Sequence, residues 1–255
     1  MTRPVKIFWR IFLYGFLGVV LFILLINWGV FGKMPSIDEL ENPSITLASE
    51  VFGDDGTPMG KYYRERGNRS YVKYNDISKH VIDALVATED KRFYDHSGID
   101  GIRLAKAVST LGRDGGASTI TQQLALNMFD ERATNIVSRI LQKIKENIIA
   151  IKLERNFTKQ EIIALYLNTV PFSDNVYGIR NASRTFFFQR ARPPFDRRSR
   201  RVGGYAKSHR HLQSRNNYKA SFDRRNTVLE LMARNSFITD AEAARLKKRT
   251  HPPEL

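Results

Sequence analysis

The chain has 255 residues, 42% of them hydrophobic, which is enough for one sizeable domain and a short additional segment. It contains no cysteine, so the sequence excludes a disulfide framework and a thiolate metal site. The formal net charge of +15 indicates an anionic partner, and nucleic acid, anionic lipid headgroups and a pyrophosphate group all satisfy it. Charge alone does not choose among these three classes.

An uncharged apolar run covers residues 11–31 and is long enough to cross a hydrocarbon core of about 30 Å as a helix. Arg3, Lys6 and Arg10 precede it, so the positive-inside rule predicts a cytoplasmic segment at 1–10. A cleaved signal peptide is the competing interpretation, but the run is long for one and no small-x-small cleavage site follows it. A buried core helix is disfavoured by the length and position of the run. We therefore expect a transmembrane signal-anchor.

Residues 32–74 are rich in Pro, Gly, Asp and Asn, which is typical of an extended connector, here one that lifts the main domain off the bilayer. Within this connector, Asp54-Asp55-Gly56 is typical of a hairpin turn. From Ile77 onward apolar residues recur at helical spacing. The predicted helices that follow the first one are at 101–111, 118–129, 134–155 and 159–169. The sequence thus predicts a mainly α domain over residues 75–250.

Chemically active side chains cluster at the end of the first of these helices. Within ten positions the chain carries Glu89, Asp90, Phe93, Tyr94 and His96. Partial burial at a helix end can raise the pKa of a carboxyl group and make it a general base. The competing interpretation is a solvated acidic helix end capped by the histidine. For an isolated Glu-Asp pair this second interpretation is the better one.

A glycine pair at 115–116 leads into a predicted helix whose first turn carries hydroxyl and amide groups. These side chains are Ser118, Thr119, Thr121, Gln122 and Gln123. Exposed N–H groups at such a helix start suit phosphate or sugar hydroxyl groups. Taken alone, Ser118 is more commonly an ordinary N-cap.

The helix predicted at 135–154 carries one apolar stripe. Its members are Val137, Ile140, Leu141, Ile144, Ile148 and Ile151. Arg139, Lys143 and Glu146 fall together on the opposite face. A carboxylate beside two cations can bind a pyrophosphate leaving group, directly or through a divalent ion such as Mg²⁺ near Glu146. A solvated Lys–Glu pair is the alternative, and without further context it is favoured.

Together these elements resemble the family 51 glycosyltransferases, the peptidoglycan polymerases of class A penicillin-binding proteins and monofunctional transglycosylases. The family motif E-D-x-x-F-x-x-H-x-G is matched at 89–98, and G-x-S-T-I-T-Q-Q is matched at 116–123. The motif R-K-x-x-E-x-x-x-A-x-x-L-E is matched at 142–154, with Gln142 in place of the arginine. A fourth motif is recognisable in Ile162, Tyr166-Leu167-Asn168, Phe172 and Tyr177-Gly178-Ile179. A fifth, R-R-x-x-V-L-x-x-M, is matched at 224–232.

The resemblance implies a lysozyme-like, mainly α glycosyltransferase domain behind one N-terminal transmembrane helix. It implies that Glu89 is the base that deprotonates the acceptor sugar's 4-hydroxyl, and that Glu146, with Lys143, stabilises the departing lipid pyrophosphate. The product it implies is a β-1,4 glycan formed with inversion. The substrate-binding residues it implies are Asp90, Phe93, His96, Ser118, Thr119, Gln122, Gln123, Lys143 and Asn168. Leu126 and Gln142 each stand where many members have a cation, so fewer charges face the leaving group.

The resemblance also implies partners and a location. The partners are the lipid-linked peptidoglycan precursor, membrane lipid and the cell-wall synthesis machinery, with no nucleic acid, since the basic residues would lie outside the cytoplasm. The location is a bacterial inner membrane, crossed once, with the catalytic domain on the extracytoplasmic side. The sequence does not contain the complete set of S-x-x-K, S-D-N and K-T-G motifs, because K-T-G is absent, so we expect no transpeptidase domain. The alternative is an inactive or truncated membrane-anchored relative with only a scaffolding role.

Residues 189–215 depart from the family pattern. They carry nine arginine or lysine residues and one acid, Asp196, where the family has an apolar helix followed by Tyr-Asn-Pro. Residues 199–214 can be encoded by codons that, read one base later, spell Ala-Ala-Val-Leu-Val-Gly-Met-Leu-Lys-Ala-Thr-Ala-Thr-Tyr-Asn-Pro. We infer a compensated pair of frameshifts. A genuine basic loop that touches anionic lipid is the rival explanation.

Overall fold

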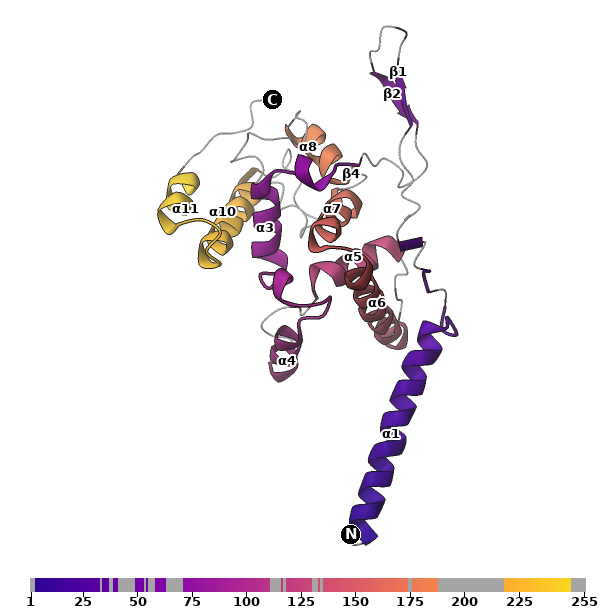
Figure 1. Ribbon diagram of the computed structural model, residues 1–255. Coiled ribbons are helices and arrows are strands. Elements are labelled where there is room, and N and C mark those ends of the chain that lie inside the picture. The colour runs from indigo at the N-terminus through magenta and orange to yellow at the C-terminus, as the bar shows by residue number, and fades with distance from the viewer. Residues whose placement is uncertain are drawn as a thin grey trace.

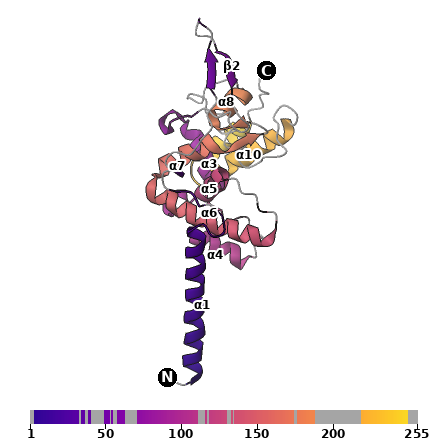
Figure 2. The same cartoon turned by 90° about the vertical axis from the view of Figure 1, so that its right-hand side faces the viewer.

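The computed structural model begins with a long apolar helix, α1 (Arg3–Asn27), that extends away from the rest of the molecule (Figures 1 and 2). The structure describes residues 3–32, 34–36, 39–40, 49–52, 54, 58–62, 71–110, 116, 118–129, 133, 135–173, 176–187 and 218–248. By length and composition α1 is able to cross a membrane, as predicted. It starts earlier than the apolar run and includes the three basic residues before that run.

The helix α1 ends at a glycine, which explains why the last apolar residues of the predicted span are not helical. Gly29 has a φ of 81°, in the left-handed region where a side chain is disfavoured. The Val30 N–H donates to the Leu25 carbonyl and the Gly29 N–H to the Ile26 carbonyl, which is the Schellman pattern of helix termination. The chain therefore turns at residues 28–32.

Part of the segment predicted to be an extended connector is packed on the domain. Leu40 is fully buried, Val72 is buried, and Met34 packs against the same core. The prediction that residues 32–74 lift the domain off the bilayer is therefore wrong for these positions, because their apolar side chains complete the core. The hairpin prediction is confirmed: β1 (Ser49–Phe52) and β2 (Pro58–Tyr62) pair antiparallel around Asp54, and the pair projects from the body (Figure 1).

The body is a set of helices around one central helix. In chain order they are α3 (Lys79–Glu89), α4 (Gly101–Ser109), α5 (Ile120–Phe129), α6 (Ile136–Asn156), α7 (Lys159–Thr169), α8 (Ile179–Phe187), α10 (Tyr218–Arg234) and α11 (Asp240–Lys247). Residues 162–169 of α7 are all buried, so this helix lies inside the domain. Short 3-10 turns occupy Tyr74–Asp76 and Phe93–Asp95, and β3 (Pro171–Ser173) pairs with β4 (Val176–Tyr177). The mainly α prediction is confirmed.

Helices α3, α5, α6 and α7 share the larger core, to which Phe93, Leu124, Leu153 and Ile163 each contribute a side chain that is not exposed to solvent. A second, smaller cluster lies between α3 and α10 and includes Ala84 and Met232. Helix α10 therefore packs on α3, far back in the sequence. Residues 188–217, which precede α10 and include the segment predicted to be frameshifted, lie outside the described residues.

The face of α6 that is buried is not the predicted apolar stripe. Ile149, Ala150 and Leu153 are buried together with Glu146, whereas Val137 and Ile140 are 67% and 56% exposed. The first turns of α6 extend beyond the core, so no described residue covers their apolar side chains. Together with the exposed apolar residues of α4 they lie at the end of the body from which α1 leaves (Figures 1 and 2).

Candidate active site

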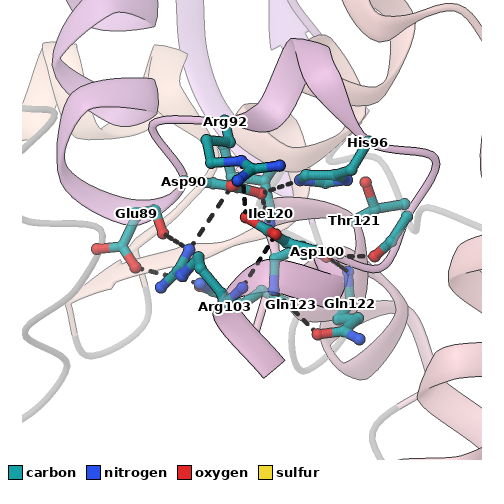
Figure 3. Close-up of polar contacts among 12 residues, drawn as sticks. Glu89, Asp90, Arg92, His96, Asp100, Arg103, Ile120, Thr121, Gln122 and Gln123 are labelled. Atoms are coloured by element: carbon teal, nitrogen blue, oxygen red, sulfur yellow. Dashed lines mark hydrogen bonds and ion pairs between the residues drawn. The ribbon is translucent and has the colours of Figure 1, made fainter. Parts of the chain in front are cut away.

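The helix α3 ends with two buried carboxylates. Glu89 is 6% exposed and Asp90 is 1% exposed, so the solvated acidic helix end considered from the sequence is wrong. The helix stops here because Asp90 takes a non-helical backbone conformation. Arg103 of α4 reaches back to this terminus, and its Nη1 donates to the Glu89 carbonyl oxygen at 2.8 Å (Figure 3). The orphan carbonyl at the helix end is thereby satisfied.

Asp90 binds other parts of the protein rather than facing solvent. Its Oδ2 accepts a hydrogen bond from the Ile120 N–H at 3.1 Å and lies 3.0 Å from His96 Nε2, and its Oδ1 is 3.6 Å from Arg103 Nη1 (Figure 3). A carboxylate at the start of α5 is favourable because helix N-termini carry partial positive charge. Asp90 thus ties the end of α3, the following loop and α5 together.

The loop after Asp90 is held by a lysine from α7. The Lys159 ammonium lies 4.3 Å from the centre of the buried Phe93 ring and donates to the His96 carbonyl at 2.6 Å. It also pairs with the Glu154 carboxylate at 2.8 Å. Phe93 and His96 are therefore built into the interior of the loop, and a direct contact with substrate stays a prediction for both.

The start of α5 is a reciprocal cap centred on Thr119. The Thr119 hydroxyl accepts from the Gln122 N–H at 3.1 Å, and the Gln122 side chain accepts from the Thr119 N–H at 2.9 Å. The suggestion that Ser118 is the N-cap is therefore wrong by one residue. Thr119 also donates to the Gly98 carbonyl and Gln122 to Asn147, and both side chains are buried. Their polar groups are occupied, so we assign them to shaping the segment.

Ser118 instead contacts the second predicted acid site. The Lys143 ammonium donates to Ser118 Oγ at 2.8 Å and to Glu146 Oε2 at 2.9 Å. The Glu146 side chain is only 12% exposed while that of Lys143 is 44% exposed, so the freely solvated pair is wrong for the acid. At the two positions where many family members carry a cation, the Leu126 side chain is exposed, and Gln142 Oε1 accepts from the Ala133 N–H. Their effect on the leaving group stays a prediction.

Gln123 connects α5 to Glu89. Its Nε2 donates to Glu89 Oε2 at 3.1 Å, and its Oε1 accepts from the Tyr166 hydroxyl at 3.0 Å. Burial and then the charge of Glu89 raise the pKa of the Tyr166 phenol above its ordinary value of 10.0, so the hydroxyl stays a donor. The sequence analysis missed three residues of this site. Tyr166 belongs to a recognised motif but had no predicted role, and no sequence signal pointed to Arg103 or Lys159.

Asn168 is engaged in the fold. Its Oδ1 accepts from the Val72 N–H, and its Nδ2 donates to the Val72 and Ala164 carbonyls, all at 2.8–2.9 Å. Because Asn168 is 2% exposed and its amide is fully used, we assign it to holding the connector, and its role in substrate binding stays a prediction.

The two predicted catalytic acids converge on one segment of the chain. Residues 118–123 contact Glu89 through Gln123, and contact Glu146 through Ser118 and Lys143. Within the described residues there is no group of three His, Cys, Asp or Glu side chains able to hold a metal ion. The cation in contact with Glu146 is Lys143.

The chain is similar to known proteins over most of its length. The sequence model of the transglycosylase family matches residues 55–233. Penicillin-binding protein 2a of Streptococcus pneumoniae is 31% identical over 92% of this chain and 32% of its own length. Penicillin-binding protein 1A of Haemophilus influenzae is 35% identical over 80% of this chain and 23% of its own length. Penicillin-binding protein 1A of Aquifex aeolicus is 37% identical over 68% of this chain and 23% of its own length. The chain thus spans about a quarter to a third of the length of these relatives.

A crystal structure of penicillin-binding protein 1A from Haemophilus influenzae aligns with 81% of this chain and 21% of its own, with a TM-score of 0.45 and 19% identity. Since the family match covers more than half of the residues, the chain belongs to the transglycosylase family, the family 51 glycosyltransferases that its motifs resemble. It is by class a glycosyltransferase.

Proposed function

We propose that this chain is a membrane-anchored peptidoglycan glycosyltransferase that polymerises lipid-linked disaccharide-peptide into β-1,4 glycan chains for cell-wall synthesis. The observation that supports it best is the convergence of Glu89 and the Lys143–Glu146 pair on residues 118–123. A base and a cation that meet at one segment are what sugar transfer from a pyrophosphate requires.

In this proposal Glu89 is the general base. It takes the proton from the acceptor's 4-hydroxyl while that oxygen forms a bond to the donor's anomeric carbon. The bond from the anomeric carbon to the lipid pyrophosphate breaks, and the leaving group departs with the electron pair, so the configuration inverts. Lys143 supplies positive charge to the leaving group, and Glu146 and Ser118 orient its ammonium.

We also propose the topology predicted from the sequence. The helix α1 crosses the bacterial inner membrane once, residues 1–10 remain cytoplasmic and the helical body lies on the extracytoplasmic side. The exposed apolar residues of α4 and α6 are at the end of the body nearest α1, where a lipid surface would cover them (Figure 2). The substrate there is lipid-carried, and further partners are expected in the cell-wall synthesis machinery rather than among nucleic acids.

The test is polymerisation of lipid-linked disaccharide-peptide by the purified full chain, with glycan length as the measurement. Glu89→Gln should abolish chain growth because the amide does not accept the proton. Glu230→Gln, which changes an exposed carboxylate on α10, is the matched control and should retain activity. Growth by Glu89→Gln at the wild-type rate would refute Glu89 as the base, and cleavage of glycan instead of growth would indicate a hydrolase.

The second candidate is an inactive relative with only a scaffolding role, which the basic composition of residues 189–215 favours. A repaired variant separates the two candidates. In it, residues 199–214 are replaced by the sixteen-residue sequence that the shifted reading frame encodes. A wild-type chain as inactive as Glu89→Gln, beside an active repaired variant, would support the scaffold.

A further inference from the structure

Three polar side chains from three helices form a chain of hydrogen bonds that ends at Glu89. Tyr166 of α7 donates to Gln123 Oε1 at 3.0 Å. Gln123 of α5 in turn donates to Glu89 Oε2 at 3.1 Å (Figure 3). Tyr166 is 1% exposed, and Gln123 is partly buried. Water therefore does not compete freely for the tyrosine hydroxyl, and the order of donors is fixed by the protein.

The two oxygens of Glu89 are in different surroundings. Oε2 accepts the bond from Gln123, whereas Oε1 is buried and has no hydrogen-bond partner in the described part of the chain. Two other buried carboxylate oxygens lack a hydrogen bond, Asp90 Oδ1 and Asp100 Oδ2, but each lies near an arginine nitrogen, at 3.6 Å and 3.4 Å. A buried acceptor with neither a donor nor a cation among the described residues is unfavourable, so such an atom in a native fold suggests a functional use. The unshared oxygen is the one available to receive a proton.

The Glu89 carboxylate determines which way the Gln123 amide faces. A carboxylate accepts hydrogen bonds only, so the amide must present its NH₂ group to Glu89. Its oxygen then faces Tyr166, whose hydroxyl donates to it. In the flipped orientation the amide oxygen would face a carboxylate oxygen, which is repulsive. The phenol hydroxyl therefore holds the far end of the amide and keeps Gln123 in place against Glu89.

We propose that Gln123 and Tyr166 are positioning residues for the general base, with Tyr166 keeping Gln123 in place and Gln123 holding Oε2 so that Oε1 receives the acceptor's proton. This inference rests on the proposed function of Glu89. It assigns Gln123 a role within the protein, in place of the predicted contact with the donor substrate, and it gives Tyr166 a role beyond core packing.

The kinetic test compares Tyr166→Phe, Gln123→Met and the double variant of the full chain. Tyr166→Phe keeps the ring in the core and removes only the hydroxyl. We expect kcat to fall about tenfold in Tyr166→Phe and about tenfold to a hundredfold in Gln123→Met, with KM within about twofold of wild type. The double variant should match Gln123→Met, because Tyr166 acts through Gln123. Tyr71→Phe, at an exposed tyrosine, is the control.

Two kinetic results would overturn the proposal. One is a double variant whose loss of kcat is the product of the two single losses, since independent effects mean that the side chains do not act in series. The other is a raised KM at unchanged kcat in Gln123→Met, which means that this side chain binds substrate.

A second readout does not depend on turnover. The side-chain amide resonances of Gln123, assigned by their disappearance in Gln123→Met, are followed by ¹⁵N NMR in the full chain. They should shift in Tyr166→Phe, which removes the donor to the amide oxygen, and in Glu89→Gln, which removes the charge of the acceptor. Resonances that are unchanged in Tyr166→Phe overturn the proposal even if polymerisation is intact. If the wild-type chain fails to polymerise, the proposed function fails, and these resonances alone decide whether Tyr166, Gln123 and Glu89 are connected.

Discussion

The side-chain amide of Asn168 pairs with the backbone of Val72 in the manner of a second peptide group, accepting from its N–H and donating to its carbonyl, both at 2.9 Å. This contact fixes the end of the connector against the central helix α7, two residues from Tyr166. The same helix thus binds the connector and supplies the first donor in the chain of hydrogen bonds from Tyr166 through Gln123 to Glu89.

The Asn168–Val72 pairing leads to a prediction about stability. Asn168→Ala should destabilise the domain by about 2–4 kcal/mol, because it leaves the buried backbone groups of Val72 without partners. The measurement is thermal unfolding followed by circular dichroism. Asn156→Ala is the matched control, since the Asn156 side chain donates to one carbonyl at an exposed position, and its effect should be below about 1 kcal/mol. Equal effects in the two variants would contradict the assignment.

Loss of charge at the adjacent acids should have different effects: at Glu89 it should remove activity, and at Asp90 it should lower the stability of the fold. Glu89→Gln should abolish polymerisation without lowering stability, since the acid has a buried oxygen with no partner in the described part of the protein. Asp90→Asn should lower stability by about 2–3 kcal/mol, because an amide cannot accept from Ile120 and pair with His96 and Arg103 as a carboxylate does. Unfolding and polymerisation measured on both variants test this, and a destabilised Glu89→Gln would contradict it.

Gly178 should be intolerant of a side chain, whereas Gly101 should accept one. Gly178 has a φ of 78°, and a Cβ there would lie 2.8 Å from the Asn168 carbonyl oxygen, a backbone atom. Gly178→Ala should therefore cost about 2–4 kcal/mol, from the strained backbone and the clash. Gly101→Ala is the control, because nothing lies within 4 Å of its Cβ position and alanine favours the helix. A stable Gly178→Ala with an unchanged melting temperature would show that the backbone shifts freely.

The cap of α7 predicts one component of the pH dependence. Two hydrogen bonds to the carboxylate lower the pKa of Glu161 below its ordinary value of 4.5. The bond from the Thr158 N–H has the larger effect, and the bond from the Thr158 hydroxyl has the smaller one. A lowered folded-state pKa contributes stability that is present above the unfolded value and is lost as the pH falls through the folded one. Stability should therefore decline below about pH 4.5, and Glu161→Gln should remove part of that decline in unfolding measured from pH 3 to 7. An identical decline in both proteins would contradict the assignment.

The composition of residues 189–215 predicts a defect in the coding sequence. Resequencing the gene should show a single-base error that shifts the reading frame before the codon of residue 199. It should also show a second error after the codon of residue 214 that restores the frame. The repaired variant should be more stable than the chain as given, because the restored apolar helix adds buried side chains worth about 2–5 kcal/mol each when removed from a core. An intact reading frame that encodes the printed protein would refute the frameshift.

Local patterns in the sequence determined the helices and the family. The predicted ranges 118–129, 134–155 and 159–169 agree with α5, α6 and α7 to within two residues, because apolar periodicity and capping residues act over a few positions. The family motifs in their order identified the glycosyltransferase class for the same reason: they are contiguous in the chain. The α6 stripe failed, since periodicity shows that a helix has an apolar face and not what covers it.

Only the tertiary structure decided which polar residues face inward and which partners they bind. Gln123, Tyr166 and Glu89 are far apart in the sequence, and so are Asn168 and Val72, so no local spacing could pair them. The tertiary structure also gave different surroundings to two neighbouring acids of one motif. Glu89 Oε1 has no hydrogen-bond partner in the described part of the chain, whereas the Asp90 carboxylate binds the Ile120 N–H and lies beside Arg103. Hydrogen bonds between helices depend on packing, and packing is a property of the whole chain.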